Sequence, residues 1–145
     1  MKLYTPLIYK ALNIAHTAHN GQFDKSGVPY IYHPAFLASQ MDTEEEVITA
    51  LLHDVVEDTP VTLEELEQAG FSQTVLDALE LLTHNDESEY TDYVRRIKGN
   101  PLAAKIKLAD LWHNNNPTRN ANLSPEKVEW YSKKYAEAIA LLDKG

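Results

Sequence analysis

The 145-residue sequence contains no cysteine and no long apolar run. The absence of cysteine excludes a disulfide framework and a cysteine-based zinc site, and it fits a reducing compartment. No apolar run approaches the length that spans a membrane, and residues 1–6 are too few and too polar for a signal peptide. We therefore expect a cytoplasmic protein without a membrane partner.

Basic residues are also scarce. Thirteen lysines and arginines stand against 22 aspartates and glutamates, which gives a formal net charge of -9. This balance argues against a nucleic-acid partner, which would need a broad basic face. The sequence has no glycine-rich phosphate loop and no Ser-His-Asp arrangement. A small phosphorylated ligand remains compatible with it, because such a site needs only a few local cations. The sequence carries no signal for an oligomeric state.

Strand patterns are missing, since no segment alternates apolar and polar residues over a sustained run. Helix-start signals recur instead, including two capping boxes in which Thr43 pairs with Glu46 and Thr62 pairs with Glu65. We predict an all-α, single-domain helical bundle over residues 1–145, with roughly seven or eight helices. The expected helices begin at Thr5-Pro6, Pro34, Thr43, Thr62, Ser72, Glu89, Asn100-Pro101 and Ser124-Pro125.

Two histidines and two aspartates form a spaced set that could hold one divalent metal ion. They are His33, the adjacent pair His53 and Asp54, and Asp110. Two imidazoles and two carboxylates suit manganese, iron, cobalt or zinc better than calcium or magnesium, which prefer oxygen ligands. Four protein ligands on an octahedral ion leave two positions for water and a substrate oxygen. Such an ion could activate the water and polarise a phosphoryl group.

Two further carboxylates follow the His53-Asp54 pair. On a continuous helix Glu57 lies four residues beyond His53, and Asp58 lies four residues beyond Asp54. Both carboxylates then share a face with the proposed ligands. We therefore predict that Glu57 and Asp58 lie beside the metal.

Several motifs occur in an order that is typical of one family. They are Lys25-Ser26-Gly27, His33-Pro34, His53-Asp54-Val55-Val56-Glu57-Asp58, Ile106-Lys107-Leu108-Ala109-Asp110 and His113-Asn114. In these motifs the sequence resembles the HD-domain metal-dependent phosphohydrolases, specifically the RelA/SpoT-type branch that hydrolyses the alarmone ppGpp. The resemblance runs from about Ala15 to Arg119.

This resemblance implies an HD-type fold and a pyrophosphohydrolase that removes the 3′-diphosphate of the alarmone. It implies a manganese ion at the four histidine and aspartate residues, although another divalent transition metal would fit the same ligands. It implies that Glu57 and Asp58 order the attacking water, and that Lys25 and Asn114 contact the nucleotide. The long enzymes of this branch carry further domains, whereas this chain ends soon after its last expected helix, and we expect a stand-alone hydrolase.

The sequence departs from the pattern of this branch beside the substrate. An arginine that stacks on the guanine usually precedes the lysine, and here that position is Asp24. The arginine that usually follows the metal-binding aspartate is Leu111, and Trp112 stands where a smaller aliphatic residue is common. We expect retained hydrolysis with a changed base preference, and a direct role for Asp24 at the base.

Other side chains near these motifs have less specific patterns. Among the basic residues around Asp110, Lys107 and Arg119 are the better candidates for phosphate contacts. His16 and His19 lie three residues apart on the first helix, and we expect them on its surface or behind the ligands. We expect Trp112 and Trp130 in the core. Residues 22–32 and 83–88 are expected as loops at the edge of the site.

Two other functions stay open. The chain could hydrolyse a different nucleotide or phosphate ester, which the substitutions at Asp24 and Leu111 favour. It could also be a metal-bound sensor that binds an alarmone without cleaving it. Glu57 and Asp58 favour an enzyme, because a binding module does not need water-activating carboxylates beyond its metal ligands.

Overall fold

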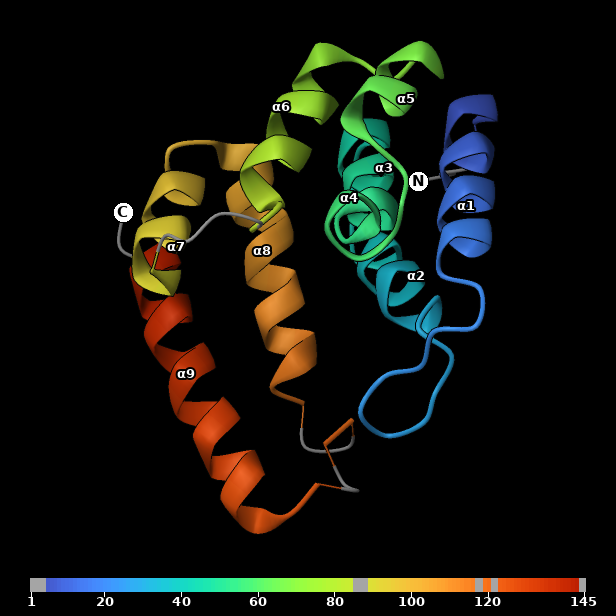
Figure 1. The fold of residues 1–145 in the computed structure, drawn as a ribbon. Helices are drawn as coiled ribbons and strands as arrows, with labels where there is room; N and C mark the ends of the chain where they lie inside the picture. Colours follow the sequence, from blue (N-terminus) through green and yellow to red (C-terminus); the bar gives the residue numbers. More distant parts are fainter. Residues whose placement is uncertain (1–4, 85–88, 117–118, 121–122, 144–145) are drawn as a thin grey trace.

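The computed structural model describes residues 5–84, 89–116, 119–120 and 123–143, and these form an assembly of α-helices (Figure 1). The helices are α1 (Pro6–Ala18), α2 (Tyr32–Ser39), α3 (Glu44–Leu52), α4 (Val55–Asp58), α5 (Leu63–Gln68), α6 (Gln73–Leu82), α7 (Tyr90–Lys98), α8 (Pro101–Asn114) and α9 (Pro125–Asp143). Extended backbone pairs in the described residues only at an isolated antiparallel bridge between Phe23 and Pro29. The prediction of an all-α fold is confirmed. No described helix combines the length and the apolar character needed to cross a membrane.

Both predicted capping boxes are present. The Thr43 hydroxyl accepts the backbone N–H of Glu46, whose carboxylate accepts the backbone N–H of Thr43 in return. Thr62 and Glu65 make the same exchange at the start of α5. Each box satisfies N–H groups that have no acceptor within their own helix. These local signals fix where α3 and α5 begin.

Helix α3 lies at the centre of the core. Its residues 47–52 are all buried, because α3 packs against α1, α2, α6 and α8. Burial of each large aliphatic side chain in such a position stabilises the fold by about 1.5–3 kcal/mol. The C-terminal end of α3, where His53 follows, is therefore held in the middle of the protein.

Helix α8 joins the two halves of the fold. It packs on α2, α3 and α6 on one side and on α7 and α9 on the other. Figure 1 shows α9 running antiparallel beside α8. Asp110, in the C-terminal half of α8, thereby faces the histidines of α2 and of the α3 end.

Two helix boundaries differ from the prediction. Helix α2 begins at Tyr32 rather than at Pro34, so the proline occupies its third position. A proline is tolerated there, because N–H groups of the first turn have no acceptor inside the helix. The helix after Thr43 was expected to continue through Asp58, but it ends at Leu52, and Val55–Asp58 forms the separate one-turn helix α4.

Candidate functional site

The structure brings the four predicted metal ligands together from three parts of the chain. His33 is the second residue of α2, His53 and Asp54 lie between α3 and α4, and Asp110 lies on α8. One ligand atom from each residue lies within 4.8 Å of all the others. His33, His53 and Asp110 are buried, and Asp54 is partly exposed. This arrangement is a buried cluster with one open side.

The orientation of His53 fits a metal ligand. Its Nδ1 lies 2.6 Å from the carbonyl oxygen of Ala50, which fixes the hydrogen on that nitrogen. Its Nε2 lies 2.8 Å from Asp54 Oδ2 and 3.6 Å from Asp110 Oδ1. This buried Nε2 nevertheless makes no well-oriented hydrogen bond in the described part of the chain. With its hydrogen on Nδ1, His53 has a free electron pair on Nε2. This pair points toward the same position as the two carboxylates, as in a site for a divalent metal ion.

The charges of the cluster also fit a cation. Burial would raise the pKa of Asp54, but the adjacent His53 imidazole outweighs this and lowers the pKa to about 2. Burial would also raise the pKa of Asp110. Lys107 and the histidines His33 and His53 outweigh this effect and hold the pKa of Asp110 well below its usual value. Both carboxylates therefore stay ionised, and a proton on His53 or a divalent cation can balance them.

Side chains around the ligands hold them in place. The Tyr30 hydroxyl donates a hydrogen bond to Asp54 Oδ2. Asn114 Nδ2 donates to Asp110 Oδ1 over 2.9 Å, and Lys107 Nζ lies 3.1 Å from Asp110 Oδ2. The sequence patterns singled out Lys107 and Asn114 as substrate contacts, but here both contact a metal ligand. Tyr30 was not identified as a site residue.

Two histidines outside the ligand set also contact this region. The His113 ring lies edge to edge with the His33 ring, with the ring planes 4° apart and the Nδ1 atoms at 2.7 Å. His19 is buried, its Nδ1 lies 2.8 Å from Gln22 Oε1, and its ring lies 4.9 Å from the Tyr30 ring. His19 therefore supports the hydroxyl that binds Asp54. The sequence predicts His19 either on the surface of the first helix or behind the metal ligands, and the structure places it behind the ligands.

The helix break changes the surroundings of Glu57 and Asp58. One helical turn persists, since the Asp58 N–H donates to the Asp54 carbonyl oxygen over 3.0 Å. Glu57 is exposed, and its Oε1 accepts a hydrogen bond from the His84 N–H over 2.5 Å. Desolvation and the nearby carboxylates of Asp54 and Glu57 raise the pKa of Asp58 to about 6. Asp58 can therefore exchange a proton near neutral pH.

The loop between α1 and α2 is organised by Asp24. Its Oδ1 accepts the N–H groups of Ser26 and Val28 over 2.8 and 3.0 Å. Its Oδ2 lies 3.5 Å from Arg119 Nε. Both oxygens have protein partners, so Asp24 holds the loop, and its expected direct role at the base stays a prediction. Gly27, with a φ of 83°, completes the turn in a conformation that favours glycine.

A cavity of about 270 Å³ lies beside this loop. Its charged and amide side chains come from Asp24, Lys25, Asn114, Arg119 and Asn120. The Lys25 ammonium lies 3.3 Å above the centre of the Tyr131 ring on α9. Arg119 donates a hydrogen bond to Asn114 Oδ1. The structure therefore gathers four of the predicted substrate contacts around one cavity: Asp24, Lys25, Asn114 and Arg119.

The expectation for the tryptophans was wrong. Trp112 and Trp130 are 60% and 59% exposed, whereas Leu111 is fully buried. Adjacent helix residues point about 100° apart, so burial of Leu111 in the core turns Trp112 outward. In the loop expected over residues 83–88, residues 85–88 lie outside the described residues.

Comparisons with known proteins agree with this geometry. A family model described as HD domain matches residues 11–110. The chain is 36% identical over 138 residues to a guanosine-3′,5′-bis(diphosphate) 3′-pyrophosphohydrolase of Haemophilus influenzae, covering 81% of this chain and 20% of that protein. It is 32% identical over 144 residues to the bifunctional (p)ppGpp synthase/hydrolase SpoT of Escherichia coli K12, covering 85% and 20%. The chain thus spans about a fifth of the length of these relatives.

A solved structure shares the fold. It is that of a metazoan ortholog of SpoT that hydrolyses ppGpp, with a TM-score of 0.78 and 24% identity. The similarity covers 99% of this chain and 89% of that one. The family match includes all four residues of the histidine and aspartate cluster. This chain belongs to the HD domain family.

Proposed function

We propose that this chain is a metal-dependent pyrophosphohydrolase that removes the 3′-diphosphate of guanosine 3′,5′-bis(diphosphate). The observation that carries the proposal is the buried His33, His53, Asp54 and Asp110 cluster with a second carboxylate pair one turn beyond Asp54. The activities for which the relatives from Haemophilus influenzae and Escherichia coli are named support the same reaction. We further propose that residues 1–145 form a single hydrolase domain that acts in the cytoplasm.

The four clustered side chains would hold the metal. Two nitrogen and two oxygen donors suit manganese, which we propose as the resident ion, and they would also accept iron, cobalt or zinc. When bound, the ion lowers the pKa of a coordinated water and offsets negative charge on the phosphoryl group. Tyr30, Lys107 and Asn114 hold the two aspartates in position through the hydrogen bonds described above.

Glu57 and Asp58 would orient the attacking water and take its proton. Asp58, with a pKa of about 6, is ionised at neutral pH yet remains basic enough to accept a proton. The His84 N–H holds one oxygen of the Glu57 carboxylate. The water oxygen bonds to the phosphorus next to the ribose, the bond from that phosphorus to the 3′-oxygen breaks, and the 3′-oxygen takes a proton. The products are the nucleoside 5′-diphosphate and pyrophosphate.

The nucleotide would lie along the cavity that Lys25, Asn114 and Arg119 line. A lysine and an arginine there can form charge-assisted hydrogen bonds with phosphate oxygens. Lys107 would contact the phosphoryl group that lies at the metal, because its ammonium is already within reach of Asp110. Positioning and electrostatics of this kind account for most phosphoryl-transfer catalysis.

One observation favours a second candidate, a hydrolase of another nucleotide. The position of the usual base-stacking arginine carries Asp24, which is occupied in holding its own loop. Arg119 lies beside Asp24 and brings a guanidinium to the same place from another part of the chain. A base could stack on this guanidinium without the hydrogen bonds that select guanine.

The two candidates are separated by a screen of nucleotides with manganese added. The bis(diphosphates) of guanosine and adenosine, nucleoside triphosphates and simple phosphate esters would be compared by release of pyrophosphate or phosphate. The proposal expects pyrophosphate from 3′-diphosphates and no release from the Asp54→Ala variant. Binding of guanosine 3′,5′-bis(diphosphate) without cleavage would instead indicate the sensor.

A further inference from the structure

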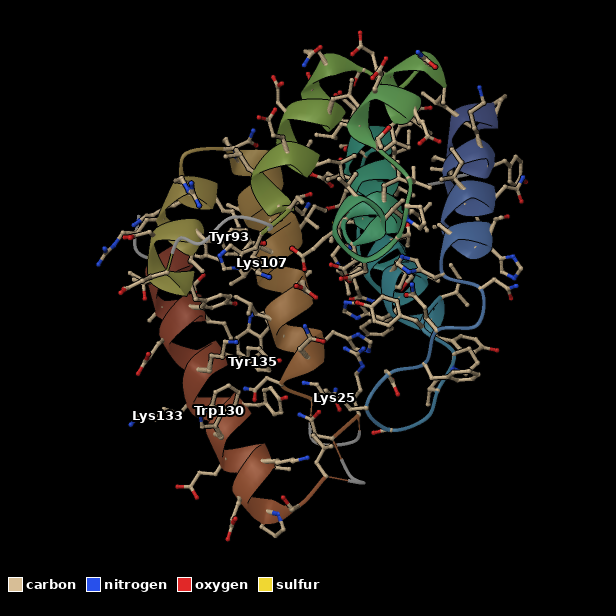
Figure 2. The ribbon with its side chains drawn as sticks, in the orientation of Figure 1. Lys25, Tyr93, Lys107, Trp130, Lys133 and Tyr135 are labelled. Carbon is tan, nitrogen blue, oxygen red and sulfur yellow. The ribbon has the colours of Figure 1, made fainter. Side chains whose placement is uncertain are left out.

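Lysine and aromatic side chains line the wall between α7, α8 and α9. Lys107 Nζ lies 5.3 Å from the centre of the Tyr93 ring and 5.8 Å from that of Tyr90. Lys134 Nζ lies 4.6 Å from the same Tyr90 ring and 5.3 Å from Trp130. Tyr90 therefore lies within 6 Å of two ammonium groups, one from α8 and one from α9. Figure 2 shows Lys107 on the side of α8 that faces Tyr93.

In the part of the chain that the structure describes, the Lys134 ammonium is held by aromatic rings. Among the described residues its ammonium contacts aromatic faces and has no carboxylate partner. Lys105 shows the contrast, because its Nζ lies 2.9 Å from Glu46 and 3.1 Å from Asp42. The described residues thus leave the half-buried Lys134 ammonium without a carboxylate, and another anion can bind it. An aromatic face attracts a cation by about 0.5–2 kcal/mol without cancelling its charge.

The same wall leads outward from the metal ligands. Lys107 contacts the metal ligand Asp110 at 3.1 Å. The Tyr90 ring is the next side chain in space, and Lys134 lies beside that ring. In the proposed orientation the 3′-diphosphate follows this wall, with its second phosphate joined to the first by one bridging oxygen. If the first phosphate lies at the metal beside Lys107, its neighbour lies toward Tyr90 and Lys134. Lys25 and Arg119 lie at a different cavity, which the nucleotide occupies in the proposed function.

We propose that Lys134, with Tyr90 and Lys107, forms a subsite for the outer phosphate of the 3′-diphosphate and so selects diphosphate over monophosphate esters. This inference rests on the proposed function for the direction of the substrate. Lys134 is a specificity-determining residue in this account. Its ammonium donates to the terminal phosphate oxygens, which carry the charge that a 3′-monophosphate lacks at this position.

The chain offers a matched control at the next residue. Lys133 is exposed, and Figure 2 shows it pointing away from α8 on the outer side of α9. Lys134→Met removes the charge and keeps an apolar stem on the aromatic rings, Lys134→Arg keeps the charge, and Lys133→Met removes a charge from the same helix outside the subsite. Thermal unfolding of each variant verifies that α9 is intact.

The first measurement is calorimetric binding of inorganic pyrophosphate and of inorganic phosphate to the manganese-loaded protein. We expect Lys134→Met to weaken pyrophosphate binding about tenfold and to leave phosphate binding within about twofold. Lys134→Arg and Lys133→Met should both resemble the wild type. Equal pyrophosphate affinity in Lys134→Met and wild type would overturn the subsite, and so would an equal loss in Lys133→Met.

The second measurement compares kcat/KM for guanosine 5′-diphosphate carrying a 3′-diphosphate or a 3′-monophosphate. Lys134→Met should reduce the preference for the 3′-diphosphate about tenfold, and an unchanged preference contradicts the subsite. The two proposals fail separately. Selective pyrophosphate binding that depends on Lys134, without hydrolysis by the wild type, would sustain the subsite and refute the proposed function. Hydrolysis that does not depend on Lys134 would do the reverse.

Discussion

The Nδ1 atoms of His33 and His113 lie 2.7 Å apart, so one ring must donate a hydrogen that the other accepts. If His33 binds a metal through Nε2, its hydrogen resides on Nδ1 and His113 is the acceptor. His113 can accept because burial, together with nearby His33 and Arg119, lowers its pKa to about 4 and keeps it neutral. His113 can thus hold His33 in the form that binds an ion, in competition with the Arg119 guanidinium, whose Nη1 lies 3.1 Å from the same His33 Nδ1.

This relationship gives a prediction for His113→Phe. The phenyl ring can still stack on Phe36, but it cannot accept the hydrogen. We expect manganese affinity to fall by about 10- to 100-fold, as for other residues that orient metal ligands. Titration with manganese under competition by a chelator measures the effect. His16→Phe, on the exposed side of α1, is the control, and equal affinity in both variants would remove the role of His113.

Glu57→Gln should keep the metal and lose turnover. The amide oxygen can still accept the His84 N–H, so the α4 turn is retained, but the amide cannot take a proton. Loss of a general base usually lowers kcat by about 10² to 10⁴. Metal analysis and steady-state turnover are measured together, with Glu64→Gln on exposed α5 as control. Full turnover would transfer the role to Asp58, and loss of the metal would make Glu57 a ligand.

Asp58 should make the chelator-treated protein less stable as pH rises. Its folded pKa of about 6 lies above the unfolded value of 3.8, so the folded state holds a proton that the unfolded state has lost between these pH values. Ionisation of Asp58 therefore lowers the free energy of unfolding progressively between about pH 4 and pH 6, and the loss stays constant above pH 6. In urea unfolding, Asp58→Asn should be more stable than the wild type above pH 6, with the difference closing below pH 4. A difference independent of pH, or one equal to that of exposed Asp92→Asn, would contradict the shift.

Asp24→Arg should damage the substrate site. The sequence predicts a changed base preference, because an anion replaces the stacking arginine, and on that basis alone Asp24→Arg would favour guanine. The structure gives a different expectation, because the Ser26 and Val28 N–H groups and Arg119 would lose their acceptor. We predict a lower kcat/KM on both guanosine and adenosine bis(diphosphates), while Asp24→Asn keeps the Oδ1 acceptor and most activity. A selective gain on guanosine in Asp24→Arg would show that the base, not the loop, depends on this position.

Local patterns predicted the helices and the composition of the site. Capping boxes at Thr43 and Thr62 involve residues three apart, so sequence alone identifies them. The metal ligands were found because two histidines and two aspartates recur in motifs with a known order. Their approach to within 4.8 Å of one another depends on the packing of α2, α3 and α8.

The features that sequence did not reveal depend on tertiary contacts. The break between α3 and α4 has no glycine or proline to mark it, and it occurs where His53 and Asp54 turn toward the cluster. Tyr30 binds Asp54 across 24 residues, which no local pattern encodes. The exposure of Trp112 follows from the side of α8 that Leu111 buries, and this is decided by the neighbouring helices.

The most direct test of the account follows the oxygen of the attacking water. The manganese-loaded protein would be incubated with guanosine 3′,5′-bis(diphosphate) in oxygen-18 water, and the products analysed by mass spectrometry. The account predicts equimolar guanosine 5′-diphosphate and pyrophosphate, with one labelled oxygen in the pyrophosphate and none in the nucleotide, and no products from Asp54→Ala. Label in the nucleotide, release of single phosphates, or undiminished reaction by Asp54→Ala would contradict it.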